Sequence, residues 1–475
     1  MNLDISIKFI CNRDLVTTSI NPATTVLDFI RKHLHLAGTK EACREGDCGA
    51  CTILIGEIIE GELKYKIVNS CLLPIGKING KHIVTIEGLN GKELNLIQNF
   101  IVDEGGTQCG FCTPGFIISM TGYFLNAQQF NIDNLIKSLD GNICRCTGYS
   151  SIIRAAHDTI DSLKKENNNN NLEFLVERKI LPEYFLQIPD RLKNLEAEIE
   201  NFEEEKGNSP IIISGGTDLF VQKPDEILDN SVSFLLKNKQ NKIIWDENNV
   251  CFIHASATIS DIKDSILLKK FFPNIDNFFS LFGSLQIRNS ATIGGNIVNA
   301  SPIGDSTIFF LTLNSKLHLK SIGSSREVML KDFFQDYKNL DLKDVERLEY
   351  LSFDLPKDKF FFNFEKVSRR TILDIASVNS AVFLTMNGNL VKDINISAGG
   401  VSPVPMLLEK TAAFLRGKEI SEENILAASS VAQSGVSPID DVRGSAAYKK
   451  LLLRQILFSH FLKMFPEKVN VEELV

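Results

Sequence analysis

The sequence lacks the long apolar runs and the basic clusters that mark two common classes of protein. No uninterrupted apolar stretch approaches the roughly 18 residues that a membrane-spanning helix needs. Runs of lysine and arginine are also missing, and the formal charge at pH 7 is −8, whereas nucleic-acid binding depends on neutralising phosphates. The seven histidines are scattered without metal-ligand spacing, and the first residues, MNLDISIKFI, have no apolar signal-peptide core. We therefore expect a cytoplasmic protein that binds neither nucleic acid nor membrane.

The length and composition favour several globular domains. At 475 residues the chain is too long for one hydrophobic core, and about three or four domains of roughly 100 to 200 residues are expected. Hydrophobic residues make up 44% and charged residues 23%, which is typical of a folded protein. The polar run KKENNNNN at 164–171 cannot bury apolar surface, so it is interpreted as a linker between domains.

Eight of the ten cysteines fall into two sets with the spacing of iron–sulfur ligands. The first set has the C-x4-C-x2-C spacing of plant-type [2Fe–2S] proteins and one later cysteine, and the second joins a C-x2-C pair to a C-x-C pair. Reducing compartments disfavour structural disulfides, so these thiols are interpreted as metal ligands. Structural zinc is the alternative, since it also takes four thiolates. The candidate ligands are Cys43, Cys48, Cys51 and Cys71, then Cys109, Cys112, Cys144 and Cys146; Cys11 and Cys251 are expected to be buried apolar residues.

The segments around the cysteines have recognisable local patterns. Alternation in 3–20 predicts a hairpin, and Thr24 or Thr25 is expected to cap the helix that follows. Glycines at 46 and 49 allow a loop to wrap closely round a cluster. Before and between the later cysteines, helical periodicity predicts a compact bundle. Thr113 is expected to cap a helix running to about Asn126, whose positive end would stabilise an anionic cluster.

Two glycine loops in the second half predict a dinucleotide site. The apolar strand at 210–213 ends in SGGTD, a turn rich in backbone N–H groups that can bind phosphate. ATIGGN at 291–296 and SPIGD at 301–305 supply a second such region, and two loops are enough to hold both ends of an extended dinucleotide. Neither loop matches G-x-G-x-x-G, so a Rossmann site is not supported. A last segment, at about 355–470, is expected to form a separate α+β unit.

These motifs together resemble those of one family. CREGDCGAC, QCGFCTPG and CRCTGY are similar to the iron–sulfur domains of the molybdenum hydroxylases, and SGGTD, TIGGN, SPIGD and EKVSRR-x3-DIASVN are similar to their FAD domain. The domain order, ending at residue 475, resembles the small iron–sulfur and FAD subunit of a bacterial xanthine dehydrogenase. The fold implied is an α+β multidomain chain, with a β-grasp [2Fe–2S] ferredoxin-like domain at 1–75, a helical-bundle [2Fe–2S] domain at 76–160, a linker at 161–175, a two-part α/β FAD-binding domain at 176–354 and a C-terminal α+β flavoprotein domain at 355–475.

The resemblance also implies roles for individual residues. The first cysteine set would ligate the cluster nearer the flavin, the second set the cluster nearer molybdenum, and Gln108 would contact the partner's pterin cofactor. Departures from relatives are Gly-Gly-Thr-Asp where Gly-Asn-Thr-Glu is frequent, Gly304 in place of serine, and Leu373 in place of an acid. The implied FAD contacts are Ile211, Ile212, Ile213, Ser214, Gly215, Gly216, Thr217, Asp218, Phe282, Thr292, Ile293, Gly294, Gly295, Asn296, Asp305, Leu351 and Lys366.

The function implied by the resemblance is electron transfer during purine (hypoxanthine or xanthine) oxidation. Electrons from the molybdopterin site of a separate large subunit would pass through two [2Fe–2S] clusters to FAD and then to NAD, in a heterotetramer with two copies of each subunit. No catalytic acid or base is assigned to this chain. One alternative keeps this role but makes the substrate an aldehyde or an N-heterocycle, because the substrate pocket lies in the other subunit. A non-enzyme alternative is a zinc-binding scaffold protein.

Overall fold

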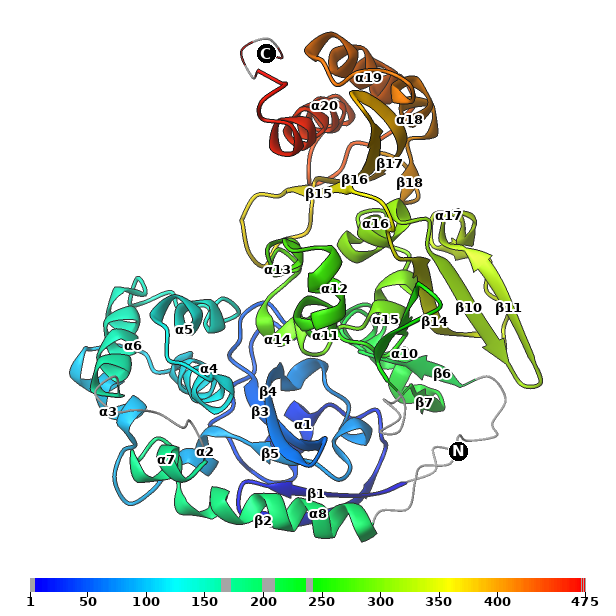
Figure 1. Ribbon diagram of the computed structural model, residues 1–475. Helices are drawn as coiled ribbons and strands as arrows, with labels where there is room; N and C mark the ends of the chain where they lie inside the picture. Colours follow the sequence, from blue (N-terminus) through cyan, green and yellow to red (C-terminus); the bar gives the residue numbers. More distant parts are fainter. Residues whose placement is uncertain are drawn as a thin grey trace. The chain divides into compact units, whose positions relative to one another are not determined.

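The computed structural model describes residues 5–163, 172–198, 210–235 and 242–470, with residues 472 and 474 (Figure 1). The chain forms two compact units, each described here by itself. Unit 1 comprises Met1–Lys239 and Ser284–Ala291, and unit 2 comprises Gln240–Gly283 and Thr292–Val475. The run at 164–171, expected to be a linker, lies outside the described residues.

Unit 1 contains a five-stranded sheet with the order β2-β1-β5-β3-β4. The expected hairpin of β1 and β2 lies at one edge of the sheet. Strand β1 also pairs in parallel with β5, and β5 pairs antiparallel with β3. The fifth strand lies beyond residue 75, where the first domain was expected to end. The strands are β1 (Ile5–Cys11), β2 (Asp14–Ile20), β3 (Thr52–Ile59), β4 (Glu62–Asn69) and β5 (His82–Val84).

Helices pack against this sheet through apolar faces. Phe9 of β1 contacts Phe29 of α1 (Val26–Lys32) edge to face, within a buried cluster. Thr25 caps α1 as expected, since its hydroxyl accepts the N–H of Asp28. Helix α8 (Ile188–Glu198) lies along β1 (Figure 1). The packing is completed by the 3₁₀ segments η1 (Ser70–Leu72), η2 (Ile75–Ile78) and η3 (Glu183–Gln187).

A helical bundle follows in the sequence, and its centre is α4 (Thr113–Asn126). Gly122 of α4 faces β4 so closely that a Cβ would lie 2.4 Å from Ile67. Thr113 was expected to cap this helix, but the N-cap is Cys112, and the Thr113 hydroxyl donates to Thr107 instead. The other helices are α2 (Ile86–Leu89), α3 (Leu96–Asp103), α5 (Ile132–Ser138), α6 (Ser150–Leu163) and α7 (Leu172–Glu177).

Unit 1 also contains short elements from the predicted flavin region. β6 (Ile211–Ile213) and β7 (Val232–Phe234) form a parallel pair, joined through α9 (Leu219–Gln222) and α10 (Pro224–Asp229). Much later in the sequence, α14 (Leu285–Arg288) also belongs to this unit.

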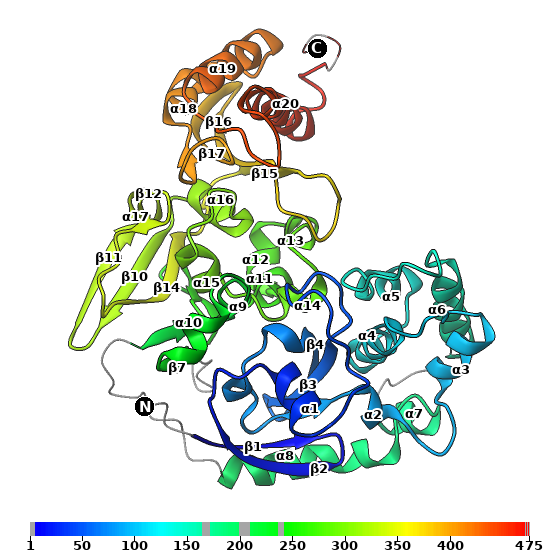
Figure 2. The same ribbon diagram turned by 180° about the vertical axis from the view of Figure 1, so that it is seen from behind.

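Figure 2 shows the strands of unit 2 from behind. In the described part of the unit they form two larger sheets and the short antiparallel pair β12-β13. The first has the order β11-β10-β14-β9-β8, and the second has the order β15-β16-β17-β18. Helix α20 (Ala446–Met464) packs on β15 and β16, and α18 (Glu409–Leu415) packs on β17, within an apolar cluster that includes Leu384, Ile394, Leu453 and Phe461. The strands are β8 (Ile244–Glu247), β9 (Val250–His254), β10 (Lys316–Ser321), β11 (Ser324–Met329), β12 (Phe334–Asp336), β13 (Asn339–Leu340), β14 (Arg347–Asp354), β15 (Phe360–Val367), β16 (Val378–Asn387), β17 (Leu390–Gly399) and β18 (Met406–Leu407).

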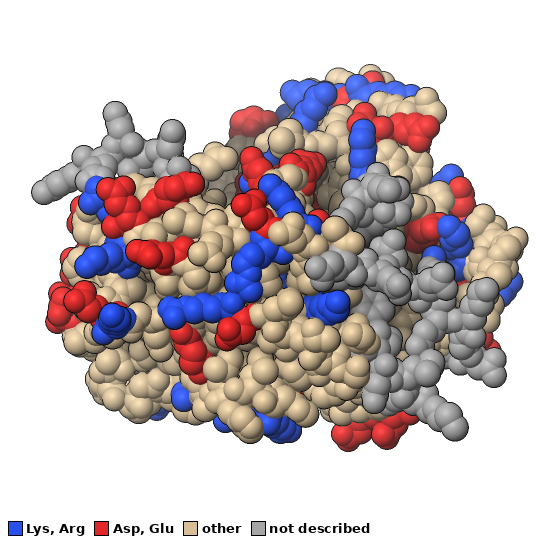
Figure 3. All heavy atoms as spheres, turned by 90° about the horizontal axis from the view of Figure 1, so that it is seen from below, with Lys and Arg blue, Asp and Glu red and all other residues tan. Residues whose placement is uncertain are grey.

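The helices of unit 2 are mostly short. The two longest, α19 (Glu422–Ser434) and α20 (Ala446–Met464), lie in the last segment, which was expected to form an α+β unit. None of the described helices is long and apolar enough to cross a membrane. On the face shown in Figure 3, basic and acidic side chains are mixed among uncharged ones. The remaining helices are α11 (Ile259–Asp264), α12 (Ile266–Phe271), α13 (Ile275–Ser280), α15 (Ile293–Val298), α16 (Asp305–Thr312), α17 (Leu330–Phe333) and α18 (Glu409–Leu415).

Candidate functional site

The first cysteine set lies in the loop before β3 and in the turn after β4. Cys51 and Cys71 are buried, and their sulfurs are 3.3 Å apart. Cys43 and Cys48 form a second, half-buried pair. The pKa of Cys43 is lowered to about 5, mainly because the Cys48 thiol donates to its sulfur. The loop and the turn therefore present two pairs of thiols, and in the half-buried pair ionisation of Cys43 is favoured.

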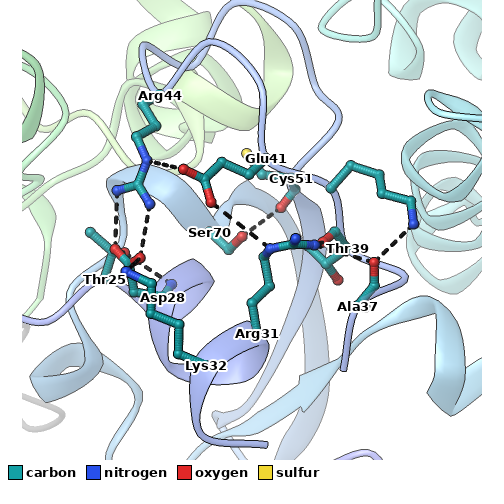
Figure 4. A network of polar contacts seen from close by, with 11 residues as sticks. Thr25, Asp28, Arg31, Lys32, Ala37, Thr39, Glu41, Arg44, Cys51 and Ser70 are labelled. Atoms are coloured by element: carbon teal, nitrogen blue, oxygen red, sulfur yellow. Dashed lines mark hydrogen bonds and ion pairs between the residues drawn. The ribbon is translucent and has the colours of Figure 1, made fainter. Parts of the chain in front are cut away.

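Arg44, between the first two cysteines, ties this loop to α1 (Figure 4). Its guanidinium donates to the two carboxylate oxygens of Asp28 at 2.8 and 3.0 Å, and to Glu41 at 2.7 Å. Burial alone would raise the pKa of Asp28, but hydrogen bonds from Arg44, Lys32 and Thr25 hold it well below its usual range. The Arg44 backbone has φ 55, a left-handed conformation that side chains disfavour. The side-chain bonds thus hold the loop in a strained shape.

The second set lies at the start of α4 and in the turn before α6. Cys109 and Cys146 are exposed, and their sulfurs are 3.5 Å apart. Cys112 and Cys144 form the other pair, with Cys144 buried. Burial works against ionisation of Cys144, but the hydroxyl of Thr147 donates to its sulfur at 3.1 Å and helps to lower its pKa. One pair of this set therefore faces solvent and the other faces the interior.

The eight thiols are thus arranged as four pairs. Two thiolates on one tetrahedral metal with bonds of about 2.3 Å lie about 3.8 Å apart, which is close to the sulfur–sulfur distances of 3.3 and 3.5 Å. In the described part of the chain, no group of three or more His, Cys, Asp or Glu is placed to hold a single metal ion. A binuclear cluster takes two thiolates at each of two irons. The pairs therefore fit the ligand sets of [2Fe–2S] clusters.

A backbone hydrogen bond joins the two sets. The N–H of Ile143, directly before Cys144, donates to the carbonyl of Cys48 at 3.0 Å. Gly49 makes this approach possible, since it has φ +67 and a Cβ there would lie 2.3 Å from the carbonyl oxygen of Gly141. The two loops are therefore in direct contact through their main chains.

The first glycine loop lies in unit 1, beside the buried cysteine pair. Ile213, at the end of β6, belongs to the same apolar cluster as Cys51, Cys71 and Phe220. The carbonyl of Ser214 accepts a hydrogen bond from the Lys77 ammonium group. Gly216 has φ +86, so the turn needs glycine at this position. The loop that was expected to bind phosphate thus leaves its strand next to the first cysteine set.

The second glycine loop lies in unit 2. Thr292 caps α15, its hydroxyl accepting the N–H of Gly295 at 3.2 Å. Gly294 lies against Ala255, where a Cβ would lie 2.7 Å from the alanine Cβ. The Asn296 side-chain oxygen accepts hydrogen bonds from the hydroxyls of Ser306 and Thr307. These contacts fix the loop relative to the start of α16.

Asp305 and Lys366 form a buried ion pair in unit 2. Lys366 Nζ lies 2.6 Å from Asp305 Oδ2, and the two side chains are 2% and 15% exposed. Asn379 Nδ2 donates to the other carboxylate oxygen, Oδ1, at 2.6 Å. The buried Asn379 Oδ1 has no hydrogen-bond partner among the described residues. Because an unsatisfied buried acceptor is costly, this cluster fits a site where a bound cofactor supplies a donor.

The other expected contacts are more dispersed. Leu351 is fully buried in β14, where it pairs with Leu317 of β10 and Ile253 of β9. Phe282 is half-buried, and Gln108 is exposed next to Cys109. The expected FAD contacts divide between the units, with 211–218 in unit 1 and the others in unit 2.

Sequence reasoning missed several residues that shape these sites. Arg44 and Asn379 were inside the quoted motifs, but nothing in the motifs distinguished them from their neighbours. Asn142 and Gln286 bond across long sequence separations, Gln286 Nε2 donating to Asn142 Oδ1 at 3.1 Å. The left-handed backbone of Arg44 and the position of Asn379 at the start of a strand are features of the fold rather than of residue spacing.

Four protein-family models match successive parts of the chain. They are a 2Fe-2S iron-sulfur cluster binding domain at residues 9–75, a [2Fe-2S] binding domain at 85–157, an FAD binding domain in molybdopterin dehydrogenase at 187–356 and a CO dehydrogenase flavoprotein C-terminal domain at 363–464. The expected order of iron–sulfur and flavin domains is therefore confirmed.

Curated relatives and solved structures agree with these matches. The xanthine dehydrogenase/oxidase of Rattus norvegicus is 28% identical over 100% of this chain and 40% of its own length. The aldehyde oxidase of Homo sapiens is 26% identical over 96% of this chain and 39% of its own. The chain thus spans about two fifths of the length of these relatives. Among solved structures, a carbon monoxide dehydrogenase from Hydrogenophaga pseudoflava has a TM-score of 0.52 at 23% identity, covering 55% of this chain and 91% of its own. Quinoline 2-oxidoreductase from Pseudomonas putida 86 has a TM-score of 0.50 at 24% identity, covering 54% and 90%.

The fold and the domain matches define an iron–sulfur flavoprotein with an α+β multidomain architecture. Its cofactors are two [2Fe–2S] clusters and FAD. Along nearly its whole length the chain is similar to xanthine dehydrogenases and aldehyde oxidases, and its matched domains are of types whose cofactors carry electrons.

Proposed function

We propose that the chain is the electron-transfer subunit of a xanthine dehydrogenase-like molybdenum hydroxylase. It would accept electrons from the molybdopterin site of a large partner subunit, deliver them to NAD, and serve the oxidation of hypoxanthine or xanthine. The proposed location is the cytoplasm, and the proposed assembly contains two copies of each subunit. The proposed domains keep the ranges 1–75, 76–160, 176–354 and 355–475, with the linker at 161–175.

The arrangement of the cysteines as four pairs carries this proposal. Cys43 with Cys48 and Cys51 with Cys71 would each hold one iron of the first cluster. In the second set, Cys109 would pair with Cys146 and Cys112 with Cys144. When bound, the clusters supply one-electron chemistry, and FAD converts between one- and two-electron steps.

The surroundings of the two sets support their order. The first set shares its apolar cluster with Ile213, at the head of the first glycine loop, which suits the cluster nearer FAD. The second set has an exposed pair of thiols, and nearby Phe111, Ile143 and Tyr149 are exposed by 43%, 43% and 38%. Exposed apolar side chains around a redox centre suit a surface that a partner subunit covers. Gln108, exposed beside Cys109, would face the partner's pterin.

The residues proposed to hold FAD are those of the two glycine loops, Phe282, Leu351, Asp305 and Lys366. Their chemistry is suitable, because the loops offer backbone N–H groups for phosphates. The Asp305–Lys366 pair adds a buried charged group that Asn379 holds in place. Gly304 offers no hydroxyl to the cofactor, whereas the neighbouring Ser306 and Thr307 donate to Asn296.

A second candidate has the same electron-transfer role with another substrate. Aldehyde oxidases are among the relatives, at identities similar to those of the xanthine dehydrogenases. An aldehyde or N-heterocycle would then be the substrate. The two candidates differ only in the partner subunit's pocket.

The experiment that tests the function uses the chain purified without oxygen together with any subunit that co-purifies. We expect a red-brown complex with about four iron atoms and acid-labile sulfide per chain, and with FAD. It should reduce NAD with xanthine or hypoxanthine as the donor. Activity with aldehydes or N-heterocycles but not with purines would favour the second candidate. A colourless protein with stoichiometric zinc would reject both and support a zinc-binding scaffold.

A further inference from the structure

A buried polar network stands at the contact between the two cysteine loops. Asn142 lies two residues before Cys144, and its Nδ2 donates to the carbonyl of Gly49 at 3.2 Å. Its Oδ1 accepts the Ser119 hydroxyl at 2.7 Å and Gln286 Nε2 at 3.1 Å. Asn142 is 5% exposed, and Ser119 and Gln286 are fully buried. The network is therefore shielded from water, and Gln286 Oε1 is its one buried oxygen without a partner among the described residues.

Gln286 reaches this network from far away in the sequence. It belongs to α14, in the segment Ser284–Ala291 that unit 1 receives from within the predicted flavin region. Two neighbours anchor the segment, since Arg288 pairs with the buried Asp140 at 3.2 Å and Asn289 Nδ2 donates to the carbonyl of Ile67 at 2.9 Å. Ile287 packs against the first cysteine loop, where a Cβ on Gly46 would lie 2.6 Å from its Cδ1. The segment thus contacts both cysteine loops.

The consequences of the network follow from its position. The side chain of Asn142 donates to the carbonyl of Gly49, and the N–H of Ile143 donates to the carbonyl of Cys48. Cys48 and Gly49 are consecutive residues of the first cysteine loop. Asn142 is in turn the residue before Ile143. The Asn142 side chain and the Ile143 N–H therefore hydrogen-bond two consecutive peptide units of the first loop. In the described part of unit 1, the only side-chain amide that donates to Asn142 Oδ1 is that of Gln286.

We propose that Gln286 is a positioning residue for electron transfer between the two clusters. Its amide holds Asn142 so that the main chains of the two cysteine loops keep their contact and their relative orientation. Gln286 touches neither the cysteine sulfurs nor the flavin loops in the described contacts, and it acts through Asn142. The inference rests on the proposed function and adds a residue to it.

The primary test is Gln286→Met in the full-length protein with its cofactors. Methionine keeps the length and volume of glutamine but donates no hydrogen bond. The spin–spin interaction between the two reduced clusters, seen in low-temperature electron paramagnetic resonance spectra, depends on their distance and orientation. We expect a weaker or reoriented interaction and slower electron exchange between the clusters, with iron, sulfide and FAD contents unchanged.

A second variant displaces Gln286 without altering it. A Cβ on Gly141 would lie 1.9 Å from Gln286 Oε1, so Gly141→Ala pushes the amide away from Asn142. If both changes act through one network, the double variant should show no more than the larger single effect. The matched control is Gln433→Met in unit 2, where Gln433 Nε2 donates to the carbonyl of Lys450 at 3.1 Å. It should leave the spectra unchanged.

The outcomes separate this inference from the function beneath it. Suppose that the wild-type protein shows two clusters, and that Gln286→Met and Gly141→Ala have the same spectra and exchange rates as the wild type. That result would overturn the role of Gln286 and leave the proposed function standing. Wild-type protein without iron would overturn the function itself. If Gln286→Met failed to fold, Gly141→Ala alone would decide the question.

Discussion

Arg288 Nη2 lies 3.2 Å from Asp140 Oδ2, and both side chains are more than nine-tenths buried. Asp140 Oδ1 also accepts the N–H of Leu285 at 3.1 Å. This ion pair fastens a segment from the middle of the predicted flavin region to the turn before Cys144. Burying two charges brings little net stability, but removing one partner leaves the other uncompensated.

We therefore expect Asp140→Ala to lower the free energy of unfolding of unit 1 by about 3–5 kcal/mol. Urea titration followed by the visible absorbance of the clusters measures this change. Asp358→Ala is the control, since Asp358 pairs with Lys392 at 3.0 Å on the surface, with side chains 69% and 57% exposed. The urea midpoint of Asp140→Ala should be clearly lower than that of Asp358→Ala. Equal midpoints would show that burial does not make the Asp140 ion pair more important than the exposed one.

Arg44→Ala should loosen the first cysteine loop. The substitution removes the hydrogen bonds from the guanidinium to Asp28 and Glu41. Residue 44 still has to adopt a left-handed backbone conformation, which alanine disfavours as arginine does. Because the arginine is partly exposed and screened, we expect a loss of about 1 kcal/mol and faster loss of iron from the first cluster to a chelator. Arg44→Gly removes the same bonds but relieves the strain, so it should retain iron longer than Arg44→Ala. The reverse order would show that strain is unimportant here.

Cys112→Ala should separate the two ends of the electron path. Loss of one proposed ligand of the second cluster should abolish electron flow from substrate to FAD in the proposed complex, while electron transfer from NADH to an artificial dye continues. Stopped-flow flavin reduction and a dye assay measure the two activities. If both survived together, the proposed order of the clusters would be wrong.

The buried His460 should make unit 2 sensitive to acid. Burial lowers its pKa to about 4, whereas the unfolded chain has the ordinary value of about 6.5. Below pH 6.5 the unfolded state therefore binds a proton that the folded state does not. Stability should fall with decreasing pH by up to about 1.4 kcal/mol per unit until the pH approaches 4.

The fluorescence of Trp245 can follow this transition, because it is the only tryptophan of the chain and lies in unit 2. His460→Gln should flatten the dependence of the unfolding midpoint on pH between 6.5 and 4. His157→Gln, at an exposed position in α6, should not. An unchanged slope in His460→Gln would show that another group is responsible.

The local elements and the cofactor set could be predicted from the sequence, because they depend on spacing. The hairpin of β1 and β2, the helix from Thr113 to Asn126 and the identity of the eight candidate cysteine ligands follow from spacing in the sequence, whereas the pairing of Cys109 with Cys146 is seen only in the folded chain. Thr113 failed as a cap because Cys112 already occupies that position and the threonine hydroxyl bonds to Thr107. Only the folded chain brings Gln286 to Asn142 and Arg288 to Asp140, since no local pattern encodes contacts between such distant residues.

The exposure of Cys109 and Cys146 has a practical consequence for handling the protein. Iron held by these two thiols would meet dissolved oxidants before iron held behind the apolar cover of Cys51 and Cys71. Preparations made in air without a covering subunit should bleach in two stages, with the signal of the second centre fading first. If the proposed partner subunit covers this pair, co-expression with it should slow the loss of the second centre.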